Sequence, residues 1–161
     1  MLDVRYVFEH SLRDDRGPRL LRYLLAHGAD EFSITVMALQ DTPAPFADAF
    51  EEAFAPHERP VAPRRALTAS TPTDFVRPVR LWAFNETSLE ALLTFLHAGL
   101  FHWPAGPDGW LEDLTIYRRG ELVLGLVSHE QEGVLRLTRD EHQEVGALDI
   151  PSELTAEWIA Y

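Results

Sequence analysis

Residues 2–8 carry apolar side chains at every second position, and charged side chains fill most of the positions between them. A period of two is typical of a strand that buries one of its faces. We therefore predict a strand over residues 2–8 with its apolar side chains turned toward the core. These alternating apolar residues are Leu2, Val4, Tyr6 and Phe8.

The pattern then changes to the period of a helix. Pro18 suits a first helical turn, leucines follow at core-facing positions through residue 25, and Gly28 suits the left-handed residue just past a helix end. These features predict a helix over residues 18–26. Residues 31–39 are apolar on both faces, which predicts a central strand and completes a strand–helix–strand unit.

Residues 41–74 are rich in Pro, Ala, Thr and Arg. A short helix is predicted where Phe46, Phe50 and Phe54 recur four residues apart on one face. The rest of this segment predicts an irregular excursion, because it has no clear period and is too long for a routine connector. It is interpreted as a functional loop, a packed arm or an ordered surface loop without a role.

Residues 77–84 resume a strand pattern, and an amphipathic helix is predicted after them. Thr87 and Glu90 have the spacing of a capping box, in which each side chain satisfies a free backbone amide at the start of a helix. Leucines at helical spacing extend this helix to about Gly99.

A hairpin, a strand and two helices are predicted for the last third. Residues 111–117 and 121–128 form a hairpin around Gly120, and a further strand covers residues 133–137. A second capping box, at Thr138 and Glu141, begins a helix that ends near Gly146. The tail after Pro151 is predicted to form a short helix ending at Trp158.

These elements predict an α+β fold. An initial β-α-β unit is followed by a mostly antiparallel sheet with helices packed on it. Neither an internal repeat nor a linker divides the chain, so we expect one domain over residues 1–161.

Composition narrows the chemistry. The 161 residues include no cysteine, which excludes disulfides, Cys-ligated zinc, iron–sulfur clusters and a thiol nucleophile. The hydrophobic fraction of 46% is enough for a packed core. We expect no cofactor, because the chain has no glycine-rich loop that would cradle a phosphate.

The charge is negative and unevenly spread. There are 26 acidic residues against 14 basic ones, a net charge of −12, and residues 108–161 hold −8 of it. This disfavours nucleic acid as a partner and favours a basic protein. All 14 basic residues are arginine, a bias typical of a G+C-rich bacterial genome that carries no information about a site.

Two features bear on location. No run of apolar residues approaches the length of about 20 that spans a bilayer. Residues 1–5 also lack the basic region and apolar run of a secretory signal. We therefore expect a cytoplasmic protein without a membrane partner.

The most polar cluster follows the apolar strand at residues 121–128. His129 with Glu130 has the residue types of a general base, His129 with Glu132 those of a metal site, and His142 lies shortly afterwards in the sequence. None of these residues has the spacing of a known catalytic or metal motif. The favoured interpretation is a turn, and no metal is expected.

Trp103 and Trp110 bracket a Pro- and Gly-rich segment. Aromatic residues beside such a loop anchor an interface in some proteins and complete a core in most. We take both tryptophans as candidate interaction residues.

Three functions remain open. The favoured one is a non-enzymatic acidic binding protein of bacterial type that neutralises or regulates a basic protein partner. The alternatives are a small metal-dependent or His/carboxylate hydrolase that uses His129, Glu130 or His142, and an accessory homo-oligomeric subunit.

Overall fold

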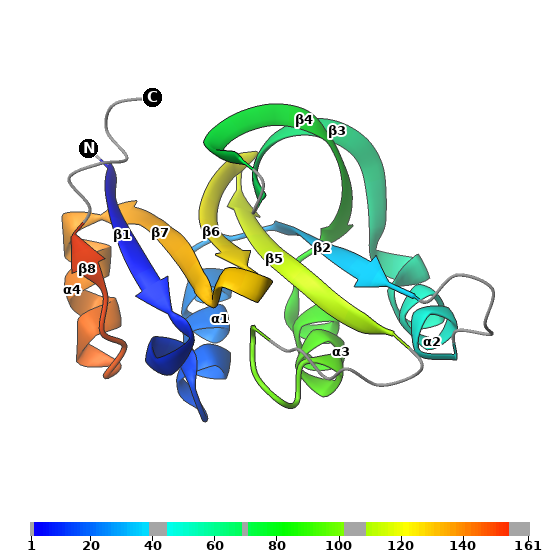
Figure 1. Cartoon of the computed structure of the whole chain (residues 1–161), viewed down its shortest axis with the longest axis horizontal. Coiled ribbons are helices and arrows are strands. Elements are labelled where there is room, and N and C mark those ends of the chain that lie inside the picture. Colours follow the sequence, from blue (N-terminus) through cyan, green and yellow to red (C-terminus); the bar gives the residue numbers. More distant parts are fainter. Residues whose placement is uncertain (1, 39–44, 69–70, 102–108, 155–161) are drawn as a thin grey trace.

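The computed structural model describes residues 2–38, 45–68, 71–101 and 109–154. It contains one eight-stranded sheet with the order β3-β4-β2-β5-β6-β7-β1-β8, and every paired neighbour is antiparallel (Figure 1). The α+β prediction is therefore confirmed. The strands are β1 Leu2–Phe8, β2 Glu31–Met37, β3 Glu58–Thr68, β4 Thr71–Ala83, β5 Trp110–Arg118, β6 Glu121–Val127, β7 Glu132–Thr138 and β8 Glu153–Leu154.

Helices connect the strands. The described α-helices are α1 Arg16–Ala26, α2 Pro45–Phe54, α3 Glu86–Phe95 and α4 Arg139–Ala147. Three short 3-10 helices also occur, η1 Glu9–Leu12, η2 Ala55–His57 and η3 Ser128–Glu130. No helix among the described residues is long and apolar enough to cross a membrane.

The predicted initial β-α-β unit is present only in part. α1 connects β1 to β2, and the two strands run in the same direction, because four antiparallel pairings separate them in the sheet. They are not neighbours, since β5, β6 and β7 lie between them. The central position predicted for β2 is confirmed by its pairing with both β4 and β5.

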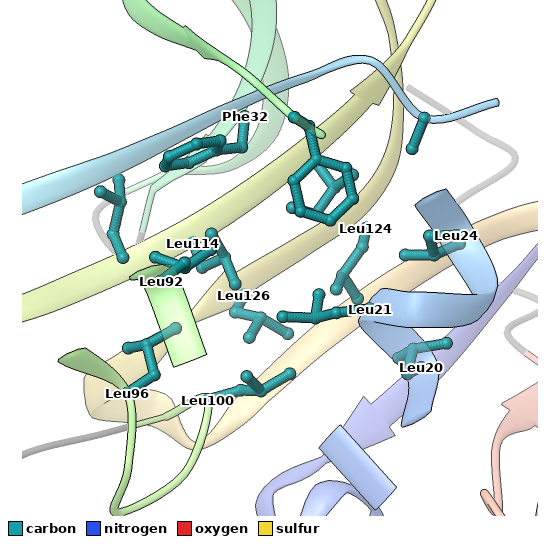
Figure 2. Close-up of a cluster of buried hydrophobic side chains, with 14 of the residues drawn as sticks. Leu20, Leu21, Leu24, Phe32, Leu92, Leu96, Leu100, Leu114, Leu124 and Leu126 are labelled. Atoms are coloured by element: carbon teal, nitrogen blue, oxygen red, sulfur yellow. The ribbon is translucent and has the colours of Figure 1, made fainter. Parts of the chain in front are cut away.

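One face of the sheet, the helix face, carries the main core. Side chains from α1 and α3 point onto side chains of β2, β5 and β6 (Figure 2). Val145 of α4 and Phe50 of α2 belong to the same buried cluster, so all four α-helices cover this one face. Burying a leucine side chain of this kind contributes about 1.5–3 kcal/mol relative to leaving it exposed.

The other face, the arch face, is covered by β3 and β4. The two strands leave the sheet together and curve over it as an arch above β6 (Figure 1). The Tyr117 hydroxyl of β5 donates to the Arg65 carbonyl oxygen of β3 at 3.0 Å, and Arg64 of β3 pairs with Glu31 of β2 at 2.7 Å. A second, smaller apolar cluster lies beneath the arch, with Val79, Leu81, Tyr117, Leu122, Val127 and Val134.

The two strands of the arch include residues for which no regular structure was predicted. The irregular excursion predicted within residues 41–74 is wrong for residues 58–68 and 71–74, which belong to β3 and β4. Three prolines hide the strand pattern there, at Pro60, Pro63 and Pro72. Proline is tolerated in edge strands and at bulges, and the β3–β4 register does shift between Arg59 and Ala62.

Smaller corrections concern β1, α3 and the tail. Val7 is the fully buried side chain of β1 and lies in the helix-face core, whereas Leu2, of the predicted buried set, is 43% exposed. α3 begins at the N-cap Asn85, which forms the capping box with Ser88 in place of Thr87 and Glu90. The tail forms β8 at residues 153–154, where a helix was predicted, and Trp158 lies outside the described residues.

Candidate functional site

The predicted polar cluster lies at one end of the sheet, where β6 turns into β7. β6 ends at Val127, η3 covers Ser128–Glu130, and Gln131 reverses the chain with a left-handed φ of 56°. β7 then begins at Glu132. The prediction that these residues form a turn at a strand end is confirmed.

Asp113 of β5 holds this turn to the sheet. Its backbone N–H donates to the Ser128 hydroxyl at 2.8 Å, and its Oδ1 accepts the Ser128 backbone N–H at 2.8 Å. Asp113 has a φ of 56°, a conformation that aspartate tolerates better than most residues. Ser128 is only 2% exposed, so its hydroxyl serves as a structural acceptor.

Asp113 was not among the site residues predicted from the sequence. The only signal available was an acidic residue within a strand that is otherwise mostly apolar. The structure shows why it matters, because burial raises the pKa of the Asp113 carboxyl group against the opposing effect of the Ser128 N–H. The negative charge of Glu112 raises this pKa further, and His129 lowers it.

Glu130 and Glu132 form a second acidic group at the same end. Burial raises the pKa of Glu132, and a hydrogen bond and charge repulsion from Glu130 add to the shift. No ion pair among the described residues involves either carboxylate. Two neighbouring carboxylates without a cation favour any positive group that comes between them.

A hollow of about 490 Å³ adjoins the turn. It is lined by residues of η1 and the two that follow it, by the segment after α3, and by Gln131 directly after η3. Its polar wall groups belong to Glu9, Arg13, Asp14, His97 and Gln131. Glu9 is paired with Arg13 at 2.7 Å, whereas Asp14 is exposed. A volume of about 490 Å³ is large enough to hold a side chain from another molecule.

His142 does not approach His129. Its Nε2 donates to the Asp3 carbonyl oxygen at 3.0 Å, and Asp3 is paired with Leu137 near the end of β7, whereas His129 precedes the start of β7. At about 3.3 Å per residue, the length of this strand separates the two histidines. Burial lowers the pKa of His142, which is 2% exposed.

The other groups near His142 also have their own partners. Glu144 accepts a hydrogen bond from the Tyr23 hydroxyl at 2.7 Å and lies 3.3 Å from His27. Asp140 is exposed at the start of α4. Within the part of the chain that is described, no three His, Asp or Glu side chains gather closely enough to hold a metal ion.

The described residues include one of the two candidate tryptophans. Trp110, at the start of β5, is half-buried, and its indole N–H donates to Glu112 Oε1 at 2.8 Å. Trp103 lies outside the described residues. A role for either tryptophan in an interface stays a prediction.

Comparisons with other proteins give no family. No family model matches the sequence, and neither a curated protein nor a solved structure matches it.

Proposed function

We propose that the protein is a non-enzymatic binding protein that takes a basic side chain of a partner protein at the η3 end of the sheet. The observation that carries this proposal is the Glu130–Glu132 pair, in which two carboxylates are neighbours and neither forms an ion pair with an arginine among the described residues. A lysine or arginine of the partner relieves the repulsion and forms charge-assisted hydrogen bonds there.

Other acidic residues of this protein contrast with that pair. Glu141 binds Arg118, and this contact lowers the pKa of Glu141 to about 2. Glu51 binds Arg80, and Glu90 binds Arg22. The protein therefore neutralises these carboxylates with its own arginines and leaves those of Glu130 and Glu132 available to a cation from outside.

The hollow beside η3 supports the same proposal. A long basic side chain needs room for its methylene groups as well as a carboxylate for its head. Leu12, Leu100 and Phe101 provide apolar wall, and Asp14 adds an exposed acidic group at the same hollow. The overall charge of −12 attracts a basic partner over longer distances.

The alternatives draw less support. A His/carboxylate hydrolase needs a base close to a reacting group, but the Ser128 hydroxyl is buried in a contact with Asp113 and the two histidines lie at opposite ends of β7. A homo-oligomer that used the η3 end would bring like charges together. A metal-dependent enzyme lacks a ligand cluster among the described residues.

The test compares two charge-matched double variants. Glu130→Gln with Glu132→Gln removes two charges at the η3 end, and Glu52→Gln with Glu86→Gln removes two from exposed helical positions. Binding of a lysine-rich peptide and of its glutamine-substituted analogue is measured by calorimetry at low and physiological salt. We expect only the first variant to weaken lysine-peptide binding by about tenfold or more, a change of about 1.4 kcal/mol.

Capture from a lysate of the source organism provides the second measurement. Wild type and the Glu52/Glu86 variant should retain the same basic protein, and the Glu130/Glu132 variant should lose it. Equal losses in both variants would show attraction by net charge alone and would contradict a site at η3. Undiminished binding by the Glu130/Glu132 variant would contradict it as well.

A further inference from the structure

A second cavity, of about 260 Å³, opens on the arch face between β4 and the strands β2 and β5. Its wall combines hydroxyl groups with charged side chains, in contrast to the apolar cluster beside it. The groups that matter are Ser33 and Thr35 of β2, Arg77 of β4, and Asp113 and Thr115 of β5.

Two of these hydroxyls are buried in the middle of the sheet. Ser33 is 8% exposed, Thr115 is 3% exposed, and the two residues are paired directly across β2 and β5. Both hydroxyls lie close enough to the Tyr117 hydroxyl to lower its pKa against the effect of burial, and Tyr117 donates to the Arg65 carbonyl oxygen at 3.0 Å. Three hydroxyls thus meet where apolar residues fill the rest of these strands.

The Ser33 and Thr115 hydroxyls lie within strands and therefore do not cap a helix. The other buried serines serve the backbone, since Ser11 accepts the Phe8 N–H, Ser88 accepts the Asn85 N–H, and Ser128 accepts the Asp113 N–H. Thr115 also serves the backbone, because its hydroxyl donates to the Asp113 carbonyl oxygen at 3.4 Å, but both Ser33 and Thr115 line the open cavity. Hydroxyls in such a position can bind a polar ligand as donors and acceptors.

Two opposite charges flank the hydroxyls. The described hydrogen bonds of the Asp113 carboxylate engage Oδ1, through the Ser128 N–H, and leave Oδ2 for a ligand. Arg77 is exposed on β4 and makes no ion pair with another described residue, yet it lies close enough to Asp113 to lower its pKa. Arg80 also lines the cavity, but Glu51 and Glu58 already hold it at 2.6 and 3.0 Å.

We propose that this cavity binds a small zwitterion of the α-amino acid class. Its ammonium group lies against Asp113 and the Ser33 and Thr115 hydroxyls, and its carboxylate pairs with Arg77. A volume of about 260 Å³ is below the usual range of drug-sized pockets, about 300–1,000 Å³, so a free amino acid fits and a nucleotide does not.

The electrostatics agree with this assignment. Burial, with a smaller effect from Glu112, raises the pKa of Asp113 even though the Ser128 N–H, His129 and Arg77 lower it, so its charged form is less favourable than that of an ordinary aspartate. An ammonium group against this carboxylate restores the charged form, as a neighbouring cation does in any protein. The proposal does not depend on the basic-partner function, because its ligand contacts neither Glu130 nor Glu132.

The first experiment is a titration followed by the backbone amide resonances. Glycine, L-alanine, L-serine and L-glutamate are added to millimolar concentrations, with methylammonium and acetate as probes for each half of the zwitterion. We expect at least one amino acid to shift the amides of residues 33, 113 and 115. Each half-ligand alone should bind about tenfold more weakly or worse.

Variants then assign the contacts. Arg77→Gln and Thr115→Val should each weaken binding by about tenfold or more, because each removes a contact to a charged group of the ligand. The matched controls are Arg59→Gln on β3 and Thr94→Val on α3, both at exposed positions outside the cavity, and these should bind as wild type does. Asp113→Asn keeps the acceptor for the Ser128 N–H while removing the charge, and should abolish binding.

Several results would overturn the proposal. One is that no amino acid shifts these amides, and another is that methylammonium binds as tightly as the best amino acid. Loss of binding in the Glu130/Glu132 variant would place the ligand at the acidic end instead. Asp113→Asn, if misfolded, is replaced by Arg77→Gln, whose exposed side chain makes no described contact needed for folding. Arg77→Gln should leave binding of the lysine-rich peptide unchanged, which separates failure of this proposal from failure of the basic-partner function.

Discussion

The two faces of the sheet bury their side chains in different ways. The helix face packs leucines and phenylalanines from four helices into one cluster, where Leu20, Leu92 and Leu124 have no exposed surface. The arch face has a smaller apolar cluster together with buried hydroxyls and a half-buried carboxylate. The larger apolar cluster lies on the helix face, and the polar groups that we propose to bind a ligand lie on the arch face.

The difference follows from what covers each face. A helix presents a continuous stripe of side chains that interdigitates with the sheet, so little space remains. A curved pair of strands covers β5 and β6 only where it crosses them, and the 260 Å³ cavity remains beside β4. Because side chains alternate between the two faces along a strand, one residue packs against the helices and the next one faces the arch.

The largest expected effect tests that contrast at neighbouring positions. Phe32 is fully buried and stacks on Trp82 at a centroid distance of 5.4 Å, whereas Ser33 faces the arch. Phe32→Ala should lower the free energy of unfolding by about 3–5 kcal/mol. Ser33→Ala should cost about 1 kcal/mol. Urea denaturation measures both, and similar losses would show that the two faces contribute alike.

A smaller effect tests how the arch is attached. Tyr117→Phe removes the hydroxyl that binds the Arg65 carbonyl oxygen and should cost about 1 kcal/mol, with faster hydrogen exchange in β3. Tyr23→Phe is the control, because it removes a hydroxyl bonded to the exposed Glu144 on the helix side. It should leave exchange in β3 unchanged. Unchanged exchange in Tyr117→Phe would mean that other contacts hold the arch.

The smallest expected effect is a loss of stability on acidification, caused by His142. Burial lowers the pKa of His142 below its ordinary 6.5, so the unfolded chain takes up this proton more readily than the folded protein. Stability from this group is therefore complete above pH 6.5 and declines as the pH falls through 6.5 toward the folded pKa. The positive charge of Arg5 lowers the pKa of His142 further, and the negative charges of Asp3 and Glu141 raise it.

The variant His142→Gln isolates this contribution, since its amide retains a donor for the Asp3 carbonyl oxygen and does not titrate. Thermal melting of both proteins between pH 8 and pH 5 gives the difference. We expect the wild type to lose more stability than the variant over that range. Parallel curves would show that His142 accepts its proton without penalty.

Local chemistry allowed some elements to be predicted from the sequence. The β5–β6 hairpin turns at Arg119 and Gly120, whose φ values of 53° and 82° match the turn that glycine indicated. The Thr138–Glu141 capping box is present as predicted, with Thr138 Oγ1 accepting the Glu141 N–H. Gly28 likewise has a φ of 87° after α1. Such features depend on residues only a few positions apart.

The predictions that were wrong needed contacts across long stretches of sequence. The β3 and β4 strands contain prolines that contradict a strand pattern, and their pairing with each other, together with contacts such as Tyr117 to Arg65, overrides that local preference. The buried face of β1 was assigned by alternation alone, yet the sheet turns Val7 toward the helices. The same holds for the candidate site. Glu130 and Glu132 follow one another closely in the sequence and were predicted, whereas Asp113 lies on another strand and was not.

The sequence by itself determined the class of fold, the absence of cysteine chemistry, the excess of acidic residues and the turn at residues 128–130. Each of these depends on composition or on neighbours within a few positions. Only the tertiary structure decided that Ser33, Arg77, Asp113 and Thr115 line one cavity and that His129 and His142 lie apart. Those relations depend on strand order and on the curvature of the arch, which arise from long-range pairing and packing that no local pattern encodes.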